Sequence, residues 1–297
     1  MCDLGENKME RLKPLNDFIF KKLFGEEGDE PMLIAFLNAV LHKTHREKIH
    51  KIKIQDNKDL TTELINDKLG RIDVRATTIE GEEINIEVQV TNQKNMDKRT
   101  LFYWSKLYLE GIKRGDDYKK LSKVITINLL DFEFLGIENY HSSFHLWEDE
   151  VKDYMLTDLV EIHFIELPKF RKLQDKNYKE NALQRWLAFL ETDISKDMLK
   201  ELMEMEPAIK MAEEKLDFLS SDPHTIQLYK AREYAEHEKA NLFSSGKEEG
   251  IKEGIKEGIK EGKKEVARAL LDVLDDETIA LKTGLTIIEI KSLRQEI

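Results

Sequence analysis

The hydrophobic positions follow a helical period at the start of the chain and an alternating, strand-like period after residue 51. The apolar spacing predicts two helices within 14–45, separated by Gly25 and Gly28, with Pro31 opening the second. The other predicted elements are strands over 52–54, 72–76, 84–90, 124–130 and 160–167 and helices over 97–114 and 179–242. This order predicts an α/β core with a helical extension.

A repeat stands out toward the C-terminus. Glycine returns every fourth residue from Gly246 to Gly262, and isoleucine does so from Ile251 to Ile259. Each glycine in a helix costs up to about 1 kcal/mol relative to alanine, and close approach of another helix offsets that cost. The tract therefore predicts either a linker or a self-associating helix.

These changes of pattern divide the chain into four predicted segments. They are an α/β domain over 1–175, a helical extension over 176–244, the Gly-x-x-x-Gly helix or linker over 245–265 and a small helical end over 266–297.

The small helical end has the pattern of a helix-turn-helix. Gly284 is predicted at the bend and a second helix near Thr286, with Ile288 and Leu293 on its packing side. Because residues 272–277 are acidic, a packing or oligomerisation element is favoured over a DNA-reading one.

Composition narrows the class of protein. The 297 residues include 59 acidic and 47 basic ones, a net charge of −12, which argues against a non-specific nucleic-acid coat but permits a local basic cleft. The sequence shows no N-terminal apolar stretch of signal-peptide length and no apolar run long enough to span a membrane, so we expect a cytoplasmic protein that does not bind membranes.

Cysteine and histidine usage limits the metal chemistry. Cys2 is the single cysteine, which excludes an internal disulfide and a cysteine-rich zinc site. His141 and His145 are four residues apart, and we expect them in a loop with a structural role. Any metal must then be held by oxygen or histidine ligands.

Two alternating segments, residues 70–76 and 84–90, predict a hairpin. Matching their apolar faces requires an odd loop, Ile79-Glu80-Gly81, with Gly81 in the left-handed conformation. In that register Asp73 lies directly across from Glu87. Like charges opposite each other destabilise a sheet.

Two explanations of this acidic pair remain open. Either a cation lies between the carboxylates, in which case oxygen ligation suits Mg²⁺ or Mn²⁺, or the hairpin has an exposed acidic face that Arg71 and Arg75 neutralise.

The order Asp73, hairpin, Glu87-Val88-Gln89 resembles the Asp…Glu-x-Lys core of the PD-(D/E)XK nuclease superfamily. More narrowly, the chain resembles the recombination-promoting nuclease and transposase family over about residues 12 to 190. The matching segments are 17–25, 71–74, 86–89, Arg99 with 103–105 and 107–108, and 165–170.

This resemblance implies a restriction-endonuclease-like mixed sheet flanked by helices, with Asp73 and Glu87 as metal ligands. The backbone carbonyl of Val88 would be a further ligand. Asp17 resembles the acidic residue that the first helix of such nucleases presents to the metal; the alternative is a helix N-cap.

Gln89 stands where the superfamily has lysine and supplies no charge. Arg99, Tyr103 and Lys106 share one face of the predicted helix. Either Arg99 or Lys106 compensates for the missing charge, or Tyr103 packs and the two cations are solvated. The residues expected to contact DNA phosphates are Arg71, Arg75, Lys98 and Arg99.

The function implied by the resemblance is a Mg²⁺-dependent (or Mn²⁺-dependent) DNA endonuclease of low sequence specificity, associated with recombination or mobile DNA. The catalytic set is Asp73, Glu87, Gln89 and Lys106. The alternative is a catalytically degenerate nuclease fold that binds DNA or a protein partner. In both cases the Gly repeat favours a homodimer through the C-terminal helices.

Overall fold

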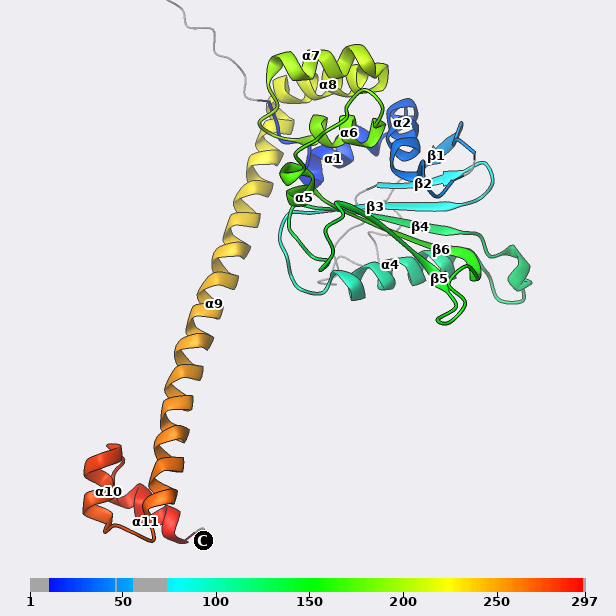
Figure 1. Cartoon of the computed structure of the whole chain (residues 1–297). Helices are drawn as coiled ribbons and strands as arrows, with labels where there is room; N and C mark the ends of the chain where they lie inside the picture. The colour runs from blue at the N-terminus through cyan, green and yellow to red at the C-terminus, as the bar shows by residue number, and fades with distance from the viewer. Residues whose placement is uncertain (1–10, 46, 56–73, 296–297) are drawn as a thin grey trace, which may run out of the picture. The chain divides into compact units, whose positions relative to one another are not determined.

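The computed structural model of the chain describes residues 11–45, 47–55 and 74–295. The chain divides into two compact units, Met1–Arg232, here called the N-terminal unit, and Glu233–Ile297, here called the C-terminal unit. Element labels follow Figure 1. The finer division into four segments stays a prediction.

The N-terminal unit is built on a mixed six-stranded sheet with the strand order β1-β2-β3-β4-β6-β5. Strands β3, β4 and β6 run parallel, and the strands β1, β2 and β5 pair antiparallel to their neighbours. The strands are β1 Ile52–Ile54, β2 Val74–Thr78, β3 Glu83–Gln89, β4 Val124–Leu130, β5 His141–Trp147 and β6 Met155–Glu166. The predicted α/β fold class, a restriction-endonuclease-like mixed sheet flanked by helices, is confirmed.

The β2–β3 hairpin has the predicted register as far as the structure describes it. Val74 pairs with Ile86 and Ala76 with Ile84. Gly81 has φ +88°, the left-handed conformation that the three-residue loop requires. The apolar faces of the two strands therefore coincide, as the alternation predicts.

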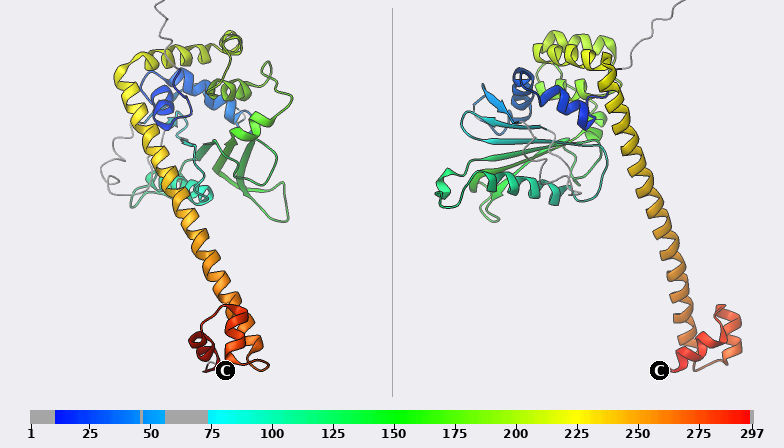
Figure 2. Two further views of the ribbon diagram at one scale, coloured as in Figure 1. Left: turned by 90° about the vertical axis from the view of Figure 1, so that its left-hand side faces the viewer. Right: turned by 180° about the vertical axis from the view of Figure 1, so that it is seen from behind.

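Helices cover both faces of the sheet (Figures 1 and 2). One face carries Ile84, Ile86 and Val88 of β3 and packs against α1 Asp17–Phe24, α2 Glu30–Leu41 and α6 Ala182–Leu190. The other face is covered by α4 Met96–Glu110, which packs on β4. Because both faces are covered, every residue of β4 is buried.

The core on the α1 and α2 face is aromatic. Phe24 lies 5.7 Å, centroid to centroid, from both Phe36 and Trp186. The short helix α5 Leu167–Lys172 follows β6 directly and adds Phe170. Helices α7 Lys196–Met205 and α8 Pro207–Ser221 extend this layer.

The C-terminal unit contains the last part of α9 Pro223–Leu270 together with α10 Asp276–Thr283 and α11 Ile287–Gln295. Gly284, at φ +68°, forms the predicted bend. The predicted packing side of α11 is half wrong: Leu293 is buried, but Ile288 is 81% exposed and Ile290 packs in its place. The Gly repeat is helical throughout, in α9.

His141 and His145 are not in a loop, which corrects the sequence-based expectation. Both belong to edge strand β5, whose pairing with β6 is irregular after Phe144. Hydrogen bonds to β6, rather than local apolar alternation, hold this polar segment in a strand. Among the described residues, no helix has the length and apolar content needed to cross a membrane.

Candidate active site

Glu87 is the predicted site residue around which the described part of the site is organised. It lies near the end of β3 on the face that α4 covers, and it is only 2% exposed. Its Oε2 accepts a hydrogen bond from Arg99 Nη2 of α4 at 3.0 Å. The alternative of an exposed acidic hairpin face is therefore wrong for Glu87.

The second oxygen of Glu87 lacks a partner. Within the described residues, Oε1 is buried without a hydrogen bond. Burial raises the pKa of the Glu87 carboxyl to about 7; the charge of Asp17 adds to this rise, and Arg99 opposes it. A buried, half-satisfied carboxylate is costly, so the site is arranged to receive positive charge.

Asp17 lies at the first position of α1, and α1 packs against β3. The N-cap of this helix is Asn16, whose side chain accepts from the backbone N–H groups of Phe18 and Ile19. The N-cap alternative for Asp17 is thus wrong. Its carboxylate is available for a charged partner.

That partner is Arg232 of α9, which sequence reasoning missed. Arg232 Nη2 is 2.9 Å from Asp17 Oδ2, and its Nε is 3.3 Å from Oδ1. The two residues are 215 positions apart and Arg232 belongs to no motif. No signal in the sequence points to this pair.

Gln89 contacts the backbone group that was predicted as a metal ligand. Its Nε2 donates a hydrogen bond to the carbonyl oxygen of Val88 at 3.0 Å. The Gln89 carbonyl in turn accepts from the backbone N–H of Asp131. Gln89 is therefore fixed at both its side chain and its backbone.

The two predicted compensating cations are placed differently. Arg99 contacts Glu87 directly, and its guanidinium lies 5.2 Å from the centroid of the Tyr103 ring. Tyr103 is buried. Lys106 is half-buried, two turns further along α4, and has no described contact with Glu87.

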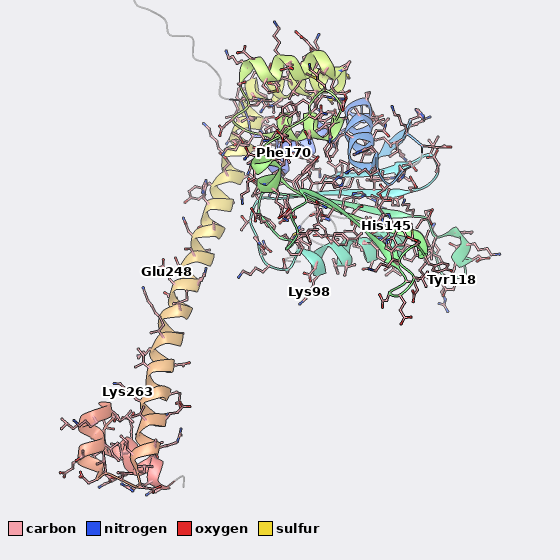
Figure 3. All side chains as sticks on the ribbon, in the orientation of Figure 1. Lys98, Tyr118, His145, Phe170, Glu248 and Lys263 are labelled. Atoms are coloured by element: carbon pink, nitrogen blue, oxygen red, sulfur yellow. The ribbon has the colours of Figure 1, made fainter. Side chains whose placement is uncertain are left out.

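The predicted DNA-contacting residues are spread over two elements. Arg75 of β2 is held between Glu83 (Nε–Oε2, 3.1 Å) and Glu110 (Nη1–Oε2, 2.7 Å). Lys98 is exposed on the outer side of α4 (Figure 3). Asp73 and Arg71 lie outside the described residues.

Polar side chains of the neighbouring strand support α4 over the site. Asn128 of β4 pairs with Glu87 in register. Its Oδ1 accepts from Thr100 Oγ1 of α4 at 2.7 Å, and its Nδ2 donates to the His163 carbonyl at 2.9 Å. These bonds fix the turn of α4 that carries Arg99.

The oxygen atoms described at this site are of the kind that binds a hard divalent cation, but there are too few of them to complete a metal site. Two carboxylates and a carbonyl oxygen are the ligands that Mg²⁺ and Mn²⁺ prefer. No group of three or more His, Cys, Asp or Glu side chains in the described part of the chain is arranged to hold a metal ion. Asp73, the predicted third carboxylate, is outside that part.

Comparison with known protein families decides the identity of the fold. A model of the PD-(D/E)XK nuclease family transposases matches residues 14–246. The chain belongs to this family. The match includes Asp17, Glu87 and Arg232. No curated protein and no solved structure matches the chain significantly.

Proposed function

We propose that this member of the nuclease family is a metal-dependent DNA endonuclease of low sequence specificity that acts in recombination or on mobile DNA. The observation that carries the proposal is the buried Glu87 carboxylate, with one oxygen on Arg99 and the other without a described partner. The second acid, Asp17, is near enough to raise the pKa of Glu87.

Asp73, Glu87 and Asp17 would hold Mg²⁺ or Mn²⁺, with the Val88 carbonyl as a further oxygen ligand. Such an ion supplies an activated water for phosphodiester hydrolysis and stabilises the leaving oxygen. For Asp17 to bind it, the Asp17–Arg232 pair has to open. The Val88 carbonyl oxygen has two lone pairs, so it can bind the ion while Gln89 donates to it.

Gln89 and the basic residues have separate roles in this proposal. Gln89 positions the attacking water through its amide, which supplies no charge. Arg99, already at Glu87, provides the positive charge that stabilises the phosphate in the transition state. Lys106 is the alternative source, from the same helix.

Duplex DNA is the proposed substrate, held through its phosphates. Lys98 is exposed on the outer side of α4 and would contact DNA phosphates there, whereas Arg99 is directed at Glu87. Arg75 and Arg71 would add further phosphate contacts, although Arg75 must exchange Glu83 and Glu110 for phosphate.

One observation favours a second candidate function, a non-catalytic scaffold that binds DNA or a protein. Each described acid of the site is neutralised by an arginine, Glu87 by Arg99 and Asp17 by Arg232. A degenerate nuclease would keep these pairs permanently closed. In either case we propose a cytoplasmic protein that self-associates through its C-terminal helices.

The test is cleavage of supercoiled plasmid by the full chain with Mg²⁺, with Mn²⁺ and with chelator. The variants are Glu87→Gln and Asp73→Asn, with Glu80→Gln, at an exposed acid in the loop of the same hairpin, as the control. We expect metal-dependent cleavage that both site variants lose and the control keeps. An inactive wild type, or equal activity in all variants, overturns the catalytic proposal and favours the scaffold.

A further inference from the structure

The C-terminal unit exposes a long apolar stripe on α9, here called the α9 stripe. It combines two rows of residues spaced by four. The Gly row consists of the glycines from Gly246 to Gly262, with Leu242 before them and Val266 after them in the same spacing, and the Ile row consists of Ile251, Ile255 and Ile259. Its exposed apolar members are 51–69% exposed: Leu242, Ile251, Ile255, Ile259 and Val266. No atom lies within 4 Å of a Cβ built at any of the five repeat glycines, Gly246, Gly250, Gly254, Gly258 and Gly262.

The α9 stripe has the dimensions of a helix–helix interface. At 1.5 Å per residue, the distance from Leu242 to Val266 is about 36 Å. Rows of glycine allow the backbone of a second helix to approach closely, and the isoleucines beside them supply the apolar contact. The repeat of four residues is longer than one helical turn of 3.6 residues, so the stripe winds slowly around α9. Two helices that pair along such a stripe cross with a right-handed twist.

The charged residues of the repeat form two rows, one on each side of the α9 stripe. With about 100° between successive residues, the Glu row adjoins the Gly row and the Lys row adjoins the Ile row. The Lys row contains Lys252, Lys256, Lys260 and Lys264, and the Glu row contains Glu249, Glu253, Glu257, Glu261 and Glu265. Glu248 and Lys263 also project from α9 (Figure 3).

The stripe has a Lys row on one side and a Glu row on the other, and this difference determines whether two identical helices pair in parallel or antiparallel. In a parallel pair of identical helices, the two-fold axis runs along the helices and places the Lys side of one against the Glu side of the other. In an antiparallel pair the axis is perpendicular to the helices, and Lys meets Lys while Glu meets Glu. Only the parallel pair is electrostatically complementary.

We propose that the α9 stripe binds the same stripe of a second copy of this chain, in parallel and in register. The proposal deepens the self-association proposed above by fixing its surface and direction. Other occupants fit less well: between Lys247 and Glu265 there are six lysines and six glutamates, so the tract has no net charge to attract a nucleic acid or an anionic lipid surface.

Cysteine cross-linking tests the direction. In a full chain with Cys2→Ser, Gly246→Cys and Gly262→Cys are introduced singly, at positions with open space for a side chain. A parallel, in-register pair brings each cysteine to its own copy, so each variant alone forms a disulfide dimer. Lys256→Cys is the matched control. In a parallel pair the Lys row of one helix faces the Glu row of the other, so the two copies of this cysteine lie apart and should not cross-link.

Sedimentation of the full chain tests the surface. We expect twice the 34.8 kDa chain mass for wild type and at least tenfold weaker association for Ile255→Asp. Leu281→Asp, which changes an 82% exposed apolar residue of α10, should associate like wild type. Circular dichroism of each variant establishes that α9 remains helical.

Two results overturn the proposal. One is a wild-type chain that remains monomeric at tens of micromolar. The other is cross-linking that occurs only in a mixture of Gly246→Cys and Gly262→Cys, which lie at equal distances from the centre of the α9 stripe and meet in an antiparallel pair. Neither readout depends on DNA cleavage, so loss of the proposed nuclease activity leaves this inference standing.

Discussion

Two buried glutamates on the same sheet have opposite surroundings. Glu87 of β3 has one arginine and one oxygen without a described partner, and burial raises its pKa to about 7. Glu161 of β6 is fully buried on the opposite face. Its Oε1 is 2.7 Å from His163 Nε2, and its Oε2, which like Glu87 Oε1 has no hydrogen bond of ordinary geometry among the described residues, forms an ion pair with Lys123 Nζ at 2.5 Å.

The pKa of Glu161 moves the other way. Burial pushes it upward, but hydrogen bonds from His163, Lys123 and Thr44 outweigh burial and hold the pKa below its usual range. His145 of β5 adds a ring nitrogen 3.7 Å from Oε2. Glu161 is thus compensated by a lysine and two histidine ring nitrogens, whereas the described partner of Glu87 is a single arginine.

The largest expected effect comes from Glu87→Gln. We expect plasmid cleavage to fall by about 10³-fold, because the substitution removes a proposed metal ligand. The free energy of unfolding should stay the same or rise, because a buried charge is removed. Cleavage assays and denaturant unfolding of the same preparation measure the two effects, and a variant that cleaves normally would break the contrast with Glu161.

The reverse pattern is expected for Glu161→Gln. Removing this charge leaves Lys123 without its partner at 2.5 Å, which costs about 3 kcal/mol of stability. Cleavage per folded molecule should remain near wild type at a temperature where the variant is folded. Equal stability of variant and wild type in urea unfolding would contradict the structural role of Glu161.

Arg99 and Lys106 should differ as sources of positive charge. Arg99→Gln is expected to lower kcat for cleavage by about 10- to 100-fold, because Arg99 contacts Glu87 at 3.0 Å. Lys106→Gln, on the same helix without a described contact to Glu87, should lower it less than about tenfold. Single-turnover rates compare them; the opposite ranking would make Lys106 the compensating cation.

The smallest expected effect is a pH dependence of stability near Glu161. Burial lowers the pKa of His141 to about 3, and its Nε2 is 2.9 Å from Nδ1 of His163. Below pH 6.5 the unfolded chain binds a proton that folded His141 does not, so stability is lost as pH falls from about 6.5 toward 3.

The matched variant for this pH effect is His141→Asn. Between pH 7 and 5 wild type should lose about 1–2 kcal/mol more than this variant. Urea unfolding at each pH measures the difference, and parallel pH curves would show that His141 titrates normally in the folded protein.

The hairpin shows why part of the site is predictable from sequence. Alternation on both sides of Gly81 fixes the pairing of Val74 with Ile86 and puts Glu87 on the polar face. Alternation does not say what covers that face. Of the two explanations left open for this face, the exposed one is therefore wrong for β3, because Asn85 and Glu87 are both buried.

Contacts between distant segments account for what sequence reasoning missed. The Asp17–Arg232 pair joins the first helix to α9 without any local pattern. Strand β5 has too many polar residues to show apolar alternation, because it is an edge strand held by its pairing with β6. Both depend on tertiary structure that a single sequence does not encode locally.

The most direct test of the central claim is the affinity of the full chain for Mn²⁺, measured by electron paramagnetic resonance without DNA. Wild type and Glu80→Gln should bind Mn²⁺ equally, while Glu87→Gln should bind at least about tenfold more weakly. Equal binding by Glu87→Gln and wild type, or no binding by either, would contradict the assignment of Glu87 as a metal ligand.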